Sequence, residues 1–151
     1  MQISTVRFGD IEVKEEQIAR FPLGIPGFDQ EKGFILIQLE PTSPFYFMQS
    51  TITASLAFMV TNPRIFFPDY ELHISSDVLA FLGTEKEEDL DVYVLLSIPE
   101  DFHATTANLL APIVINRTAN VAVQSIPPQS PYSTKQPLFP KRDSGDQSRV
   151  G

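Results

Sequence analysis

The chain has 151 residues, of which 42% are hydrophobic and 20% charged, so it is large enough to bury the core of one globular domain. It contains no cysteine, which excludes disulfide bridges, thiolate metal sites and cysteine nucleophiles. Nineteen acidic residues against eleven basic ones give a formal net charge of −8, which disfavours contact with a nucleic-acid backbone and favours either a basic partner or simple solubility.

The first part of the chain predicts short strands and one shaped loop. Residues 2–13 ("QISTVRFGDIEV") indicate two strands with Gly9 and Asp10 at the bend, and residues 14–21 ("KEEQIARF") indicate a helical turn. Residues 21–28 ("FPLGIPGF") place prolines and glycines among apolar side chains, which is typical of a fixed loop, and we expect Phe21, Pro26 and Phe28 to be buried.

Apolar strands dominate the middle of the chain. Residues 33–40 ("GFILIQLE"), 44–50 ("PFYFMQS") and 56–61 ("LAFMVT") each predict one strand, and Asn62 and Pro63 then predict a turn. Residues 69–74 ("DYELHI") alternate polar and apolar side chains, as a half-buried strand does.

The best helix signal covers residues 75–83 ("SSDVLAFLG"). Ser75 or Ser76 can cap it, Asp77 lies near its positive end, and Gly83 can end it. An acidic loop follows, and residues 91–98 then predict another strand.

Residues 105–124 ("TTANLLAPIVINRTANVAVQ") begin like a helix, but Pro112 blocks one because it lacks an amide hydrogen. We expect residues 106–108 to form a polar strand entry, residues 109–115 to cross the core and residues 117–120 to turn the chain. The pattern as a whole predicts a mainly β fold, a small antiparallel β-barrel-like single domain with one or two short helices.

We expect this domain to span residues 1–140, and residues 141–151 to be a disordered tail or a cloning remnant. The start of the sequence lacks the basic and apolar segments of a signal peptide, and no apolar run approaches the ~20 residues of a membrane span. The expected location is therefore the cytoplasm.

No phosphate-binding loop, zinc motif or nucleophile motif is present, and we expect no catalytic residue, metal site or cofactor. His73 is expected to face solvent and His103 to lie in a loop. Two alternatives stay open. One is a small enzyme that uses Asp69 and Glu71 on one strand face, and the other is an oligonucleotide-binding barrel, which the net charge of −8 disfavours.

Five segments, "FPLGIPGF", "FMQS", "LAFMVTNP", "DYEL" and "TTANLLAPIVIN", occur in an order that resembles the FliW family of flagellar assembly factors, over residues 3–132. The resemblance implies a small β-barrel-like, non-enzymatic protein that binds the dimeric RNA-binding translational repressor CsrA and also binds flagellin. Flagellin would occupy the protein and leave CsrA to repress flagellin translation; once flagellin is exported, the protein would bind CsrA and relieve repression. It also implies no direct contact with nucleic acid or membrane, and we expect a monomer when the protein is free.

The partner-binding candidates follow from polarity and position. Gln49 and Asn62 are polar ends of apolar strands that can offer hydrogen bonds to an incoming segment. Asn108 either shapes its loop or contacts a partner at the barrel rim, and the acidic run is the preferred contributor to a basic interface. The full set of candidates is Gln49, Asn62, Asp69, Tyr70, Glu85, Glu87, Glu88, Asp89 and Asn108.

Overall fold

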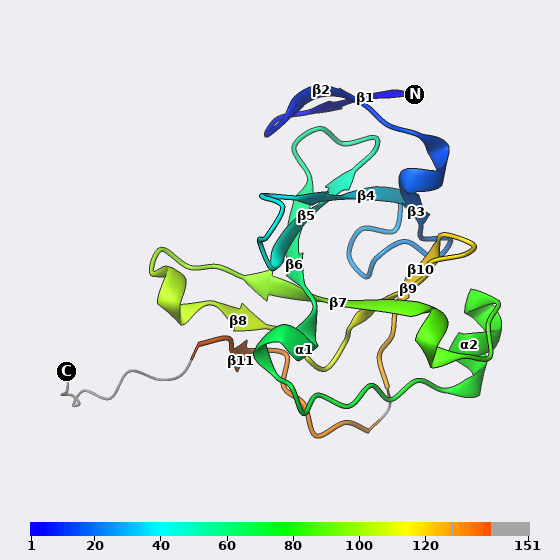
Figure 1. Ribbon diagram of the computed structural model, residues 1–151, viewed down its shortest axis with the longest axis vertical. Helices are drawn as coiled ribbons and strands as arrows, with labels where there is room; N and C mark the ends of the chain where they lie inside the picture. The colour runs from blue at the N-terminus through cyan, green and yellow to red at the C-terminus, as the bar shows by residue number, and fades with distance from the viewer. Residues whose placement is uncertain (128, 140–151) are drawn as a thin grey trace.

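Seven strands close into a barrel in the computed structural model, which describes residues 1–127 and 129–139 (Figure 1). These strands are β3 (Ile18–Arg20), β4 (Gly33–Gln38), β5 (Phe45–Ser50), β6 (Ala57–Thr61), β7 (Leu90–Ser97), β9 (Ile113–Asn116) and β10 (Val121–Gln124). Strands β3 to β7 pair antiparallel in chain order, β7 pairs with β9, and β9 pairs with β10. The barrel closes where Val121 of β10 lies opposite Arg20 of β3 in a parallel pair.

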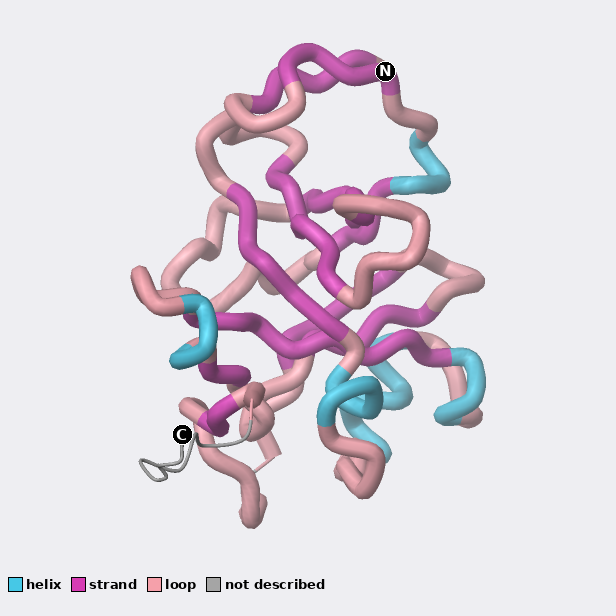
Figure 2. The backbone as a smooth tube through the Cα atoms, turned by 60° about the vertical axis from the view of Figure 1, so that its left-hand side comes forward, coloured by secondary structure: helices cyan, strands magenta, loops and turns pink. Residues whose placement is uncertain are grey.

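The remaining elements lie at the two ends of the barrel. A hairpin and the one-turn helix that follows it lie toward one end, and the other helices and two short strands gather toward the other, as the turned view in Figure 2 also shows. No helix in the described part of the chain is long and apolar enough to cross a membrane. The elements outside the barrel are β1 (Gln2–Thr5), β2 (Gly9–Glu12), η1 (Glu15–Gln17), α1 (Pro63–Phe66), α2 (Ser76–Leu82), η2 (Glu87–Asp89), η3 (Phe102–Ala104), β8 (Thr106–Ala107) and β11 (Gln136–Pro137).

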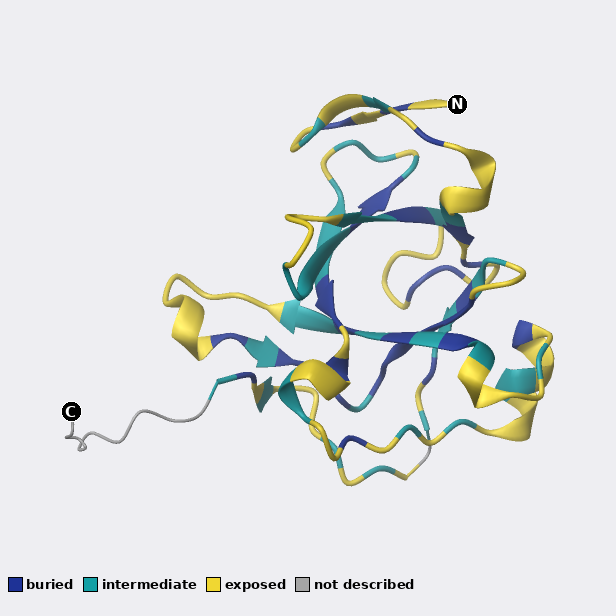
Figure 3. Ribbon diagram, viewed as in Figure 1, coloured by how far each residue is buried: buried dark blue, intermediate teal, exposed yellow. Residues whose placement is uncertain are grey.

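The main core fills the barrel with side chains from alternate positions of its strands. Figure 3 shows that the buried residues lie mainly along these strands. Phe34 and Met48 are fully buried on neighbouring strands, and Phe21 packs edge-on against Phe34 with ring centroids 5.3 Å apart. Ile25, at 2% exposure, follows from the loop after β3. The core therefore includes the proline-glycine loop as well as the strands.

Several expectations from the sequence are confirmed. The fold is mainly β, and the strands expected near residues 33–40, 44–50, 56–61 and 91–98 are β4 to β7. Helix α2 begins and ends as its sequence predicts. The Ser75 hydroxyl accepts a hydrogen bond from the Val78 amide at 3.2 Å, and Gly83 ends the helix with φ of 80° in the left-handed region.

Two turn predictions are wrong. Gly9 and Asp10 belong to β2, and the bend is the three-residue loop before them, in which the Phe8 amide donates to the Thr5 hydroxyl at 2.8 Å. Gly9 has φ of 69°, the left-handed residue that such a three-residue loop needs. Asn62 and Pro63 start α1, because the Asn62 side chain accepts from the Arg64 amide and Pro63 supplies a preset φ at the first helical position.

Two strand predictions and part of one burial prediction are also wrong. Residues 69–74 form no strand, although their exposure alternates, and β9 begins only at Ile113, so residues 109–112 are irregular. Pro26 is exposed and Phe28 is 40% exposed, because Ile25 takes the buried place in that loop. The predictions for residues 141–151 lie outside the described residues.

Candidate functional site

The acidic side chains gather on the loop that joins α2 to β7. Glu85, Glu87 and Glu88 are exposed, whereas Asp89 is half-buried and its carboxylate accepts a hydrogen bond from the Thr84 hydroxyl at 3.0 Å. The described residues contain no cluster of three or more His, Cys, Asp or Glu side chains placed to hold a metal ion. The loop thus presents free carboxylates to solvent.

Arg117 fixes this loop from the turn between β9 and β10. Its Nη1 forms an ion pair with Asp91 Oδ1 at 2.7 Å, and its Nη2 donates to the backbone oxygen of Glu88. Its amide also donates to the backbone oxygen of Asp89 at 3.2 Å. Two of these links hold the loop backbone at Glu88 and Asp89, and the ion pair anchors Arg117 to β7, so the backbone under the exposed carboxylates is ordered before any partner arrives.

Arg117 was not predicted as a residue that supports the acidic loop, because its position in the sequence indicates only a turn. The sequence carries no signal for this contact, because Arg117 and Asp91 lie 26 positions apart and meet through the pairing of β7 with β9. Asn116 strengthens the same junction, because its side-chain nitrogen donates to the Leu82 backbone oxygen at 2.7 Å at the end of α2. The turn therefore binds both the helix end and the acidic loop.

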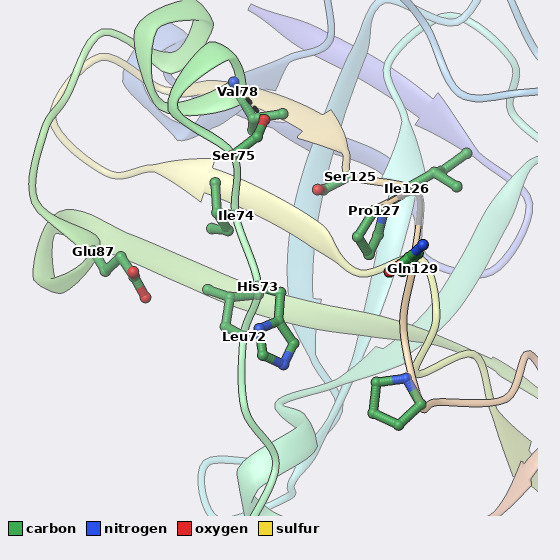
Figure 4. A pocket seen from close by; sticks show the side chains of 11 residues that line it. Leu72, His73, Ile74, Ser75, Val78, Glu87, Ser125, Ile126, Pro127 and Gln129 are labelled. Carbon is green, nitrogen blue, oxygen red and sulfur yellow. Dashed lines mark hydrogen bonds between the residues drawn. The ribbon is translucent and has the colours of Figure 1, made fainter.

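A groove with a volume of about 590 Å³ lies beside this loop (Figure 4). One wall is the irregular segment that leads into α2, and the other is the proline-containing segment after β10. The lining mixes half-buried aliphatic side chains with polar ones, and Glu87 of the acidic loop reaches it. The groove is lined by Leu72, His73, Ile74, Ser75, Val78, Glu87, Ser125, Ile126, Pro127, Gln129 and Pro131.

Gln49 does not present its amide to a partner in this structure. It is fully buried, and its Nε2 donates to the backbone oxygens of Ser50, Thr53 and Ala54 at 3.1 to 3.3 Å. Its Oε1 is buried and has no hydrogen-bond partner among the described residues. Gln49 thus holds the loop after β5, contrary to the expectation of an exposed strand end.

The other single candidates lie apart from the acidic loop. Asn62 is exposed and caps α1, and Asp69 is exposed on the irregular segment that follows. The Asn108 side chain accepts a hydrogen bond from the Ala111 amide at 3.1 Å. Asn108 therefore shapes its loop, which is one of the two roles expected for it. Asp69 and Glu71 share no strand face, and the carboxylate-enzyme alternative loses the geometry on which it was based.

Tyr70 is a structural residue, 6% exposed, whose hydroxyl donates to the Leu109 backbone oxygen at 3.1 Å. Burial, with the nearby Tyr132 as a second cause, raises the pKa of Tyr70 from 10.0 to about 12. Burial also raises the pKa of Tyr93 to about 12, and the Asp91 carboxylate adds to this shift. Both phenols therefore stay neutral at physiological pH.

The two histidines lie in separate places, and among the described residues neither ring forms a hydrogen bond with a Ser or Thr hydroxyl. His73 is exposed on the groove wall, as its alternation predicted. The His103 ring lies 3.5 Å from the Asp101 carboxylate and packs near Phe139, in the short helix η3. The site features that remain are the acidic loop and the groove beside it.

Comparisons with known proteins agree on one family. The family model described as FliW protein matches residues 2–138. The chain is 39% identical over 150 residues to the flagellar assembly factor FliW of Syntrophomonas wolfei, covering 99% of this chain and 96% of that protein. It is 41% identical to the protein of the same name from Bacillus subtilis, covering 91% and 96% respectively. A crystal structure of the flagellar assembly factor FliW superimposes with a TM-score of 0.88 at 43% identity, covering 94% of this chain and 99% of that one.

Proposed function

The chain belongs to the FliW family, and from this we propose that it is a cytoplasmic flagellar assembly factor that antagonises the translational repressor CsrA and binds flagellin in alternation with it. Bound flagellin keeps the protein away from CsrA, which then represses flagellin translation. Export of flagellin frees the protein to bind CsrA, and repression is relieved. The role is non-enzymatic, needs no cofactor, and involves neither direct nucleic-acid nor membrane contact.

The acidic loop is the observation that best supports antagonism of an RNA-binding protein. A surface that holds RNA must be basic, and a bound domain of net charge −8 adds negative potential beside it. Because the Debye length is about 8 Å at physiological salt, only carboxylates close to the RNA path repel it. Glu87 and Glu88 are exposed on a backbone that Arg117 fixes, and in this proposal they are the carboxylates that lie beside the RNA path.

The proposed mechanism is docking beside the RNA site followed by electrostatic exclusion of RNA. It requires a monomeric protein that offers the loop to one face of the CsrA dimer. Among the earlier candidates, Glu85, Glu87, Glu88 and Asp89 belong to this surface. The proposal assigns no direct partner contact to the remaining candidates, which act through the fold that holds the acidic loop. They are Asn62, Asp69, Tyr70, Asn108 and the buried Gln49.

The experiment is calorimetry of the protein into the CsrA of its own organism, repeated after saturation with flagellin. We expect tight binding that flagellin abolishes. The double variant Glu87→Lys/Glu88→Lys should weaken displacement of RNA from CsrA, because it reverses two carboxylates at the proposed contact.

A matched control is Glu15→Lys/Glu16→Lys, which makes the same charge change on η1, another exposed one-turn helix with two adjacent glutamates. Equal effects of the two double variants would remove the acidic loop from the mechanism and leave only net charge. No binding heat and no comigration with CsrA on a sizing column would overturn the proposed function itself.

A further inference from the structure

The wall of the groove that leads into α2 has main-chain groups with no partner among the described residues. Within the described residues, the amides and carbonyls of Leu72, His73 and Ile74 make no hydrogen bond to another part of the chain. The segment is held on either side, by the Glu71 amide donating to the Tyr132 hydroxyl at 2.8 Å and by Ser75 capping α2. A run of free amides and carbonyls in a held segment is the feature that strand addition uses.

Among the described residues, the opposite wall makes no main-chain hydrogen bond to residues 72–74. Pro127 and Pro131 have no amide hydrogen, so this wall is a poor strand partner for residues 72–74. It is tied at its start by the Ser125 amide, which donates to the Pro112 backbone oxygen at 2.8 Å. The space of about 590 Å³ between the two walls is open to an incoming chain.

The lining determines what kind of chain fits. Leu72, Ile74 and Val78 give the groove a half-buried aliphatic side, and Ile126 adds an aliphatic side chain that is 59% exposed. Glu87 is the charged residue of the lining, which contains no Lys or Arg. The exposed carboxylate of Glu71 adjoins the same wall in sequence. An extended segment that alternates aliphatic and basic side chains complements this lining, and an acidic one is repelled.

We propose that this groove binds an extended, basic segment of a protein partner by adding it as a strand to residues 72–74. Its aliphatic side chains lie on the Leu72 and Ile74 side, and a Lys or Arg pairs with Glu87. The inference rests on the proposed function in that the partner is the basic repressor. It adds to that function a specific contact, because Glu87 belongs to both the groove and the acidic loop.

The test is residue-resolved amide hydrogen exchange of the full chain, free and saturated with CsrA. We expect exchange at one or more of the Leu72, His73 and Ile74 amides to slow at least about tenfold in the complex, since main-chain pairing removes those amides from water. Leu23, exposed at 63% in the loop after β3, is the internal control and should keep its rate. A complex that forms while all three amides keep their free rates overturns the proposal and leaves the proposed function intact.

A second measurement does not depend on CsrA. The probe is a capped octapeptide of alternating valine and lysine, titrated into the chain and followed by amide chemical shifts, with a valine-glutamate octapeptide as its counterpart. We expect shifts at residues 72–74 for the lysine peptide alone, and an affinity about two- to fivefold weaker in Glu87→Gln, the range of one exposed ion pair.

The control variant is Glu100→Gln, which removes an exposed carboxylate from the loop after β7. It should leave the affinity unchanged. Equal shifts with both peptides, or shifts that avoid the groove, overturn the proposal. The peptide titration tests the groove proposal even when no complex with CsrA forms. The absence of that complex would overturn the proposed function separately.

Discussion

Replacing Arg117 with alanine separates the placement of the acidic loop from its charge. The ion pair with Asp91 joins side chains that are 49% and 39% exposed, so solvent screens it and we expect it to contribute about 0.2 to 1 kcal/mol. The hydrogen bond from Nη2 to the Glu88 backbone oxygen contributes about 1 kcal/mol more. The total loss of about 1 to 2 kcal/mol corresponds to a fall in Tm of about 3 to 6 °C for a chain of this size.

Arg117→Ala should change RNA displacement in opposite directions, depending on whether net charge or the placement of the acidic loop drives antagonism. Removing one positive charge takes the net charge from −8 to −9, so an antagonist that works by net charge alone becomes stronger. An antagonist that works by holding Glu87 and Glu88 beside the RNA path becomes weaker, because the loop backbone loses one of its two links to Arg117 and the ion pair with Asp91 is lost as well. We expect a fall in RNA displacement of about threefold to tenfold, equivalent to about 0.7 to 1.4 kcal/mol.

The assay is displacement of labelled RNA from CsrA, with amide exchange across residues 84–91 measured in parallel. Arg20→Ala is the matched control, because it makes the same charge change and removes a hydrogen bond from Arg20 Nη2 to Ala119 in the same turn, 2.8 Å long, without touching the acidic loop. Faster exchange in the loop and weaker displacement are expected only for Arg117→Ala. Unchanged exchange, or equal displacement by both variants, would refute the reasoning.

Three further predictions concern the fold that carries these features. Tyr70→Phe should destabilise the protein by about 1 to 2 kcal/mol in urea unfolding, since the buried Leu109 oxygen loses its donor. The raised pKa of Tyr70 means that its contribution is fully present below pH 10 and is lost as pH rises toward 12, so Tyr70→Phe should flatten the alkaline fall in stability by up to about 3 kcal/mol. Ser75→Ala should cost about 1 kcal/mol and speed exchange at the Val78 amide, with unchanged exchange contradicting the cap. Ile113→Ala, at a fully buried core position, should cost about 2 to 5 kcal/mol, and a smaller loss would mean that the barrel collapses around the cavity.

Hydrophobic pattern predicted β4 to β7, because these strands bury one face against a shared interior, but it missed β3, since residues 14–21 were expected to form a helical turn and residues 18–20 form a barrel strand. It failed at residues 69–74, where the alternation is real: Tyr70 is buried, Glu71 and His73 are exposed, and Leu72 is half-buried. Alternation records which side of an extended segment faces the protein, and it does not record whether another strand pairs with that segment. The same segment now forms the unpaired wall of the groove.

The acidic loop could be found from the sequence because its members are neighbours in the chain. Arg117 could not be assigned to it, since its ion pair with Asp91 spans 26 positions and depends on the pairing of β7 with β9. The prediction that Gln49 presents its amide to a partner was wrong for a related reason. Its polar side chain suggested an exposed strand end, but the loop after β5 folds back over it, and Ser50, Thr53 and Ala54 supply carbonyl acceptors.

The turn between β9 and β10 connects the two proposed contact surfaces. Asn116 binds the last turn of α2 through the Leu82 oxygen, and Arg117 binds the acidic loop that follows the same helix. The first turn of α2 supplies Val78 to the groove, and the acidic loop supplies Glu87. The turn thus holds α2 and the acidic loop, and through them the part of the groove that Val78 and Glu87 line. A partner that contacts the loop and fills the groove meets a surface that is already ordered. The ordering cost that binding usually carries is reduced for both contacts together, which is why we expect loosening the turn at Arg117 to weaken the whole interface.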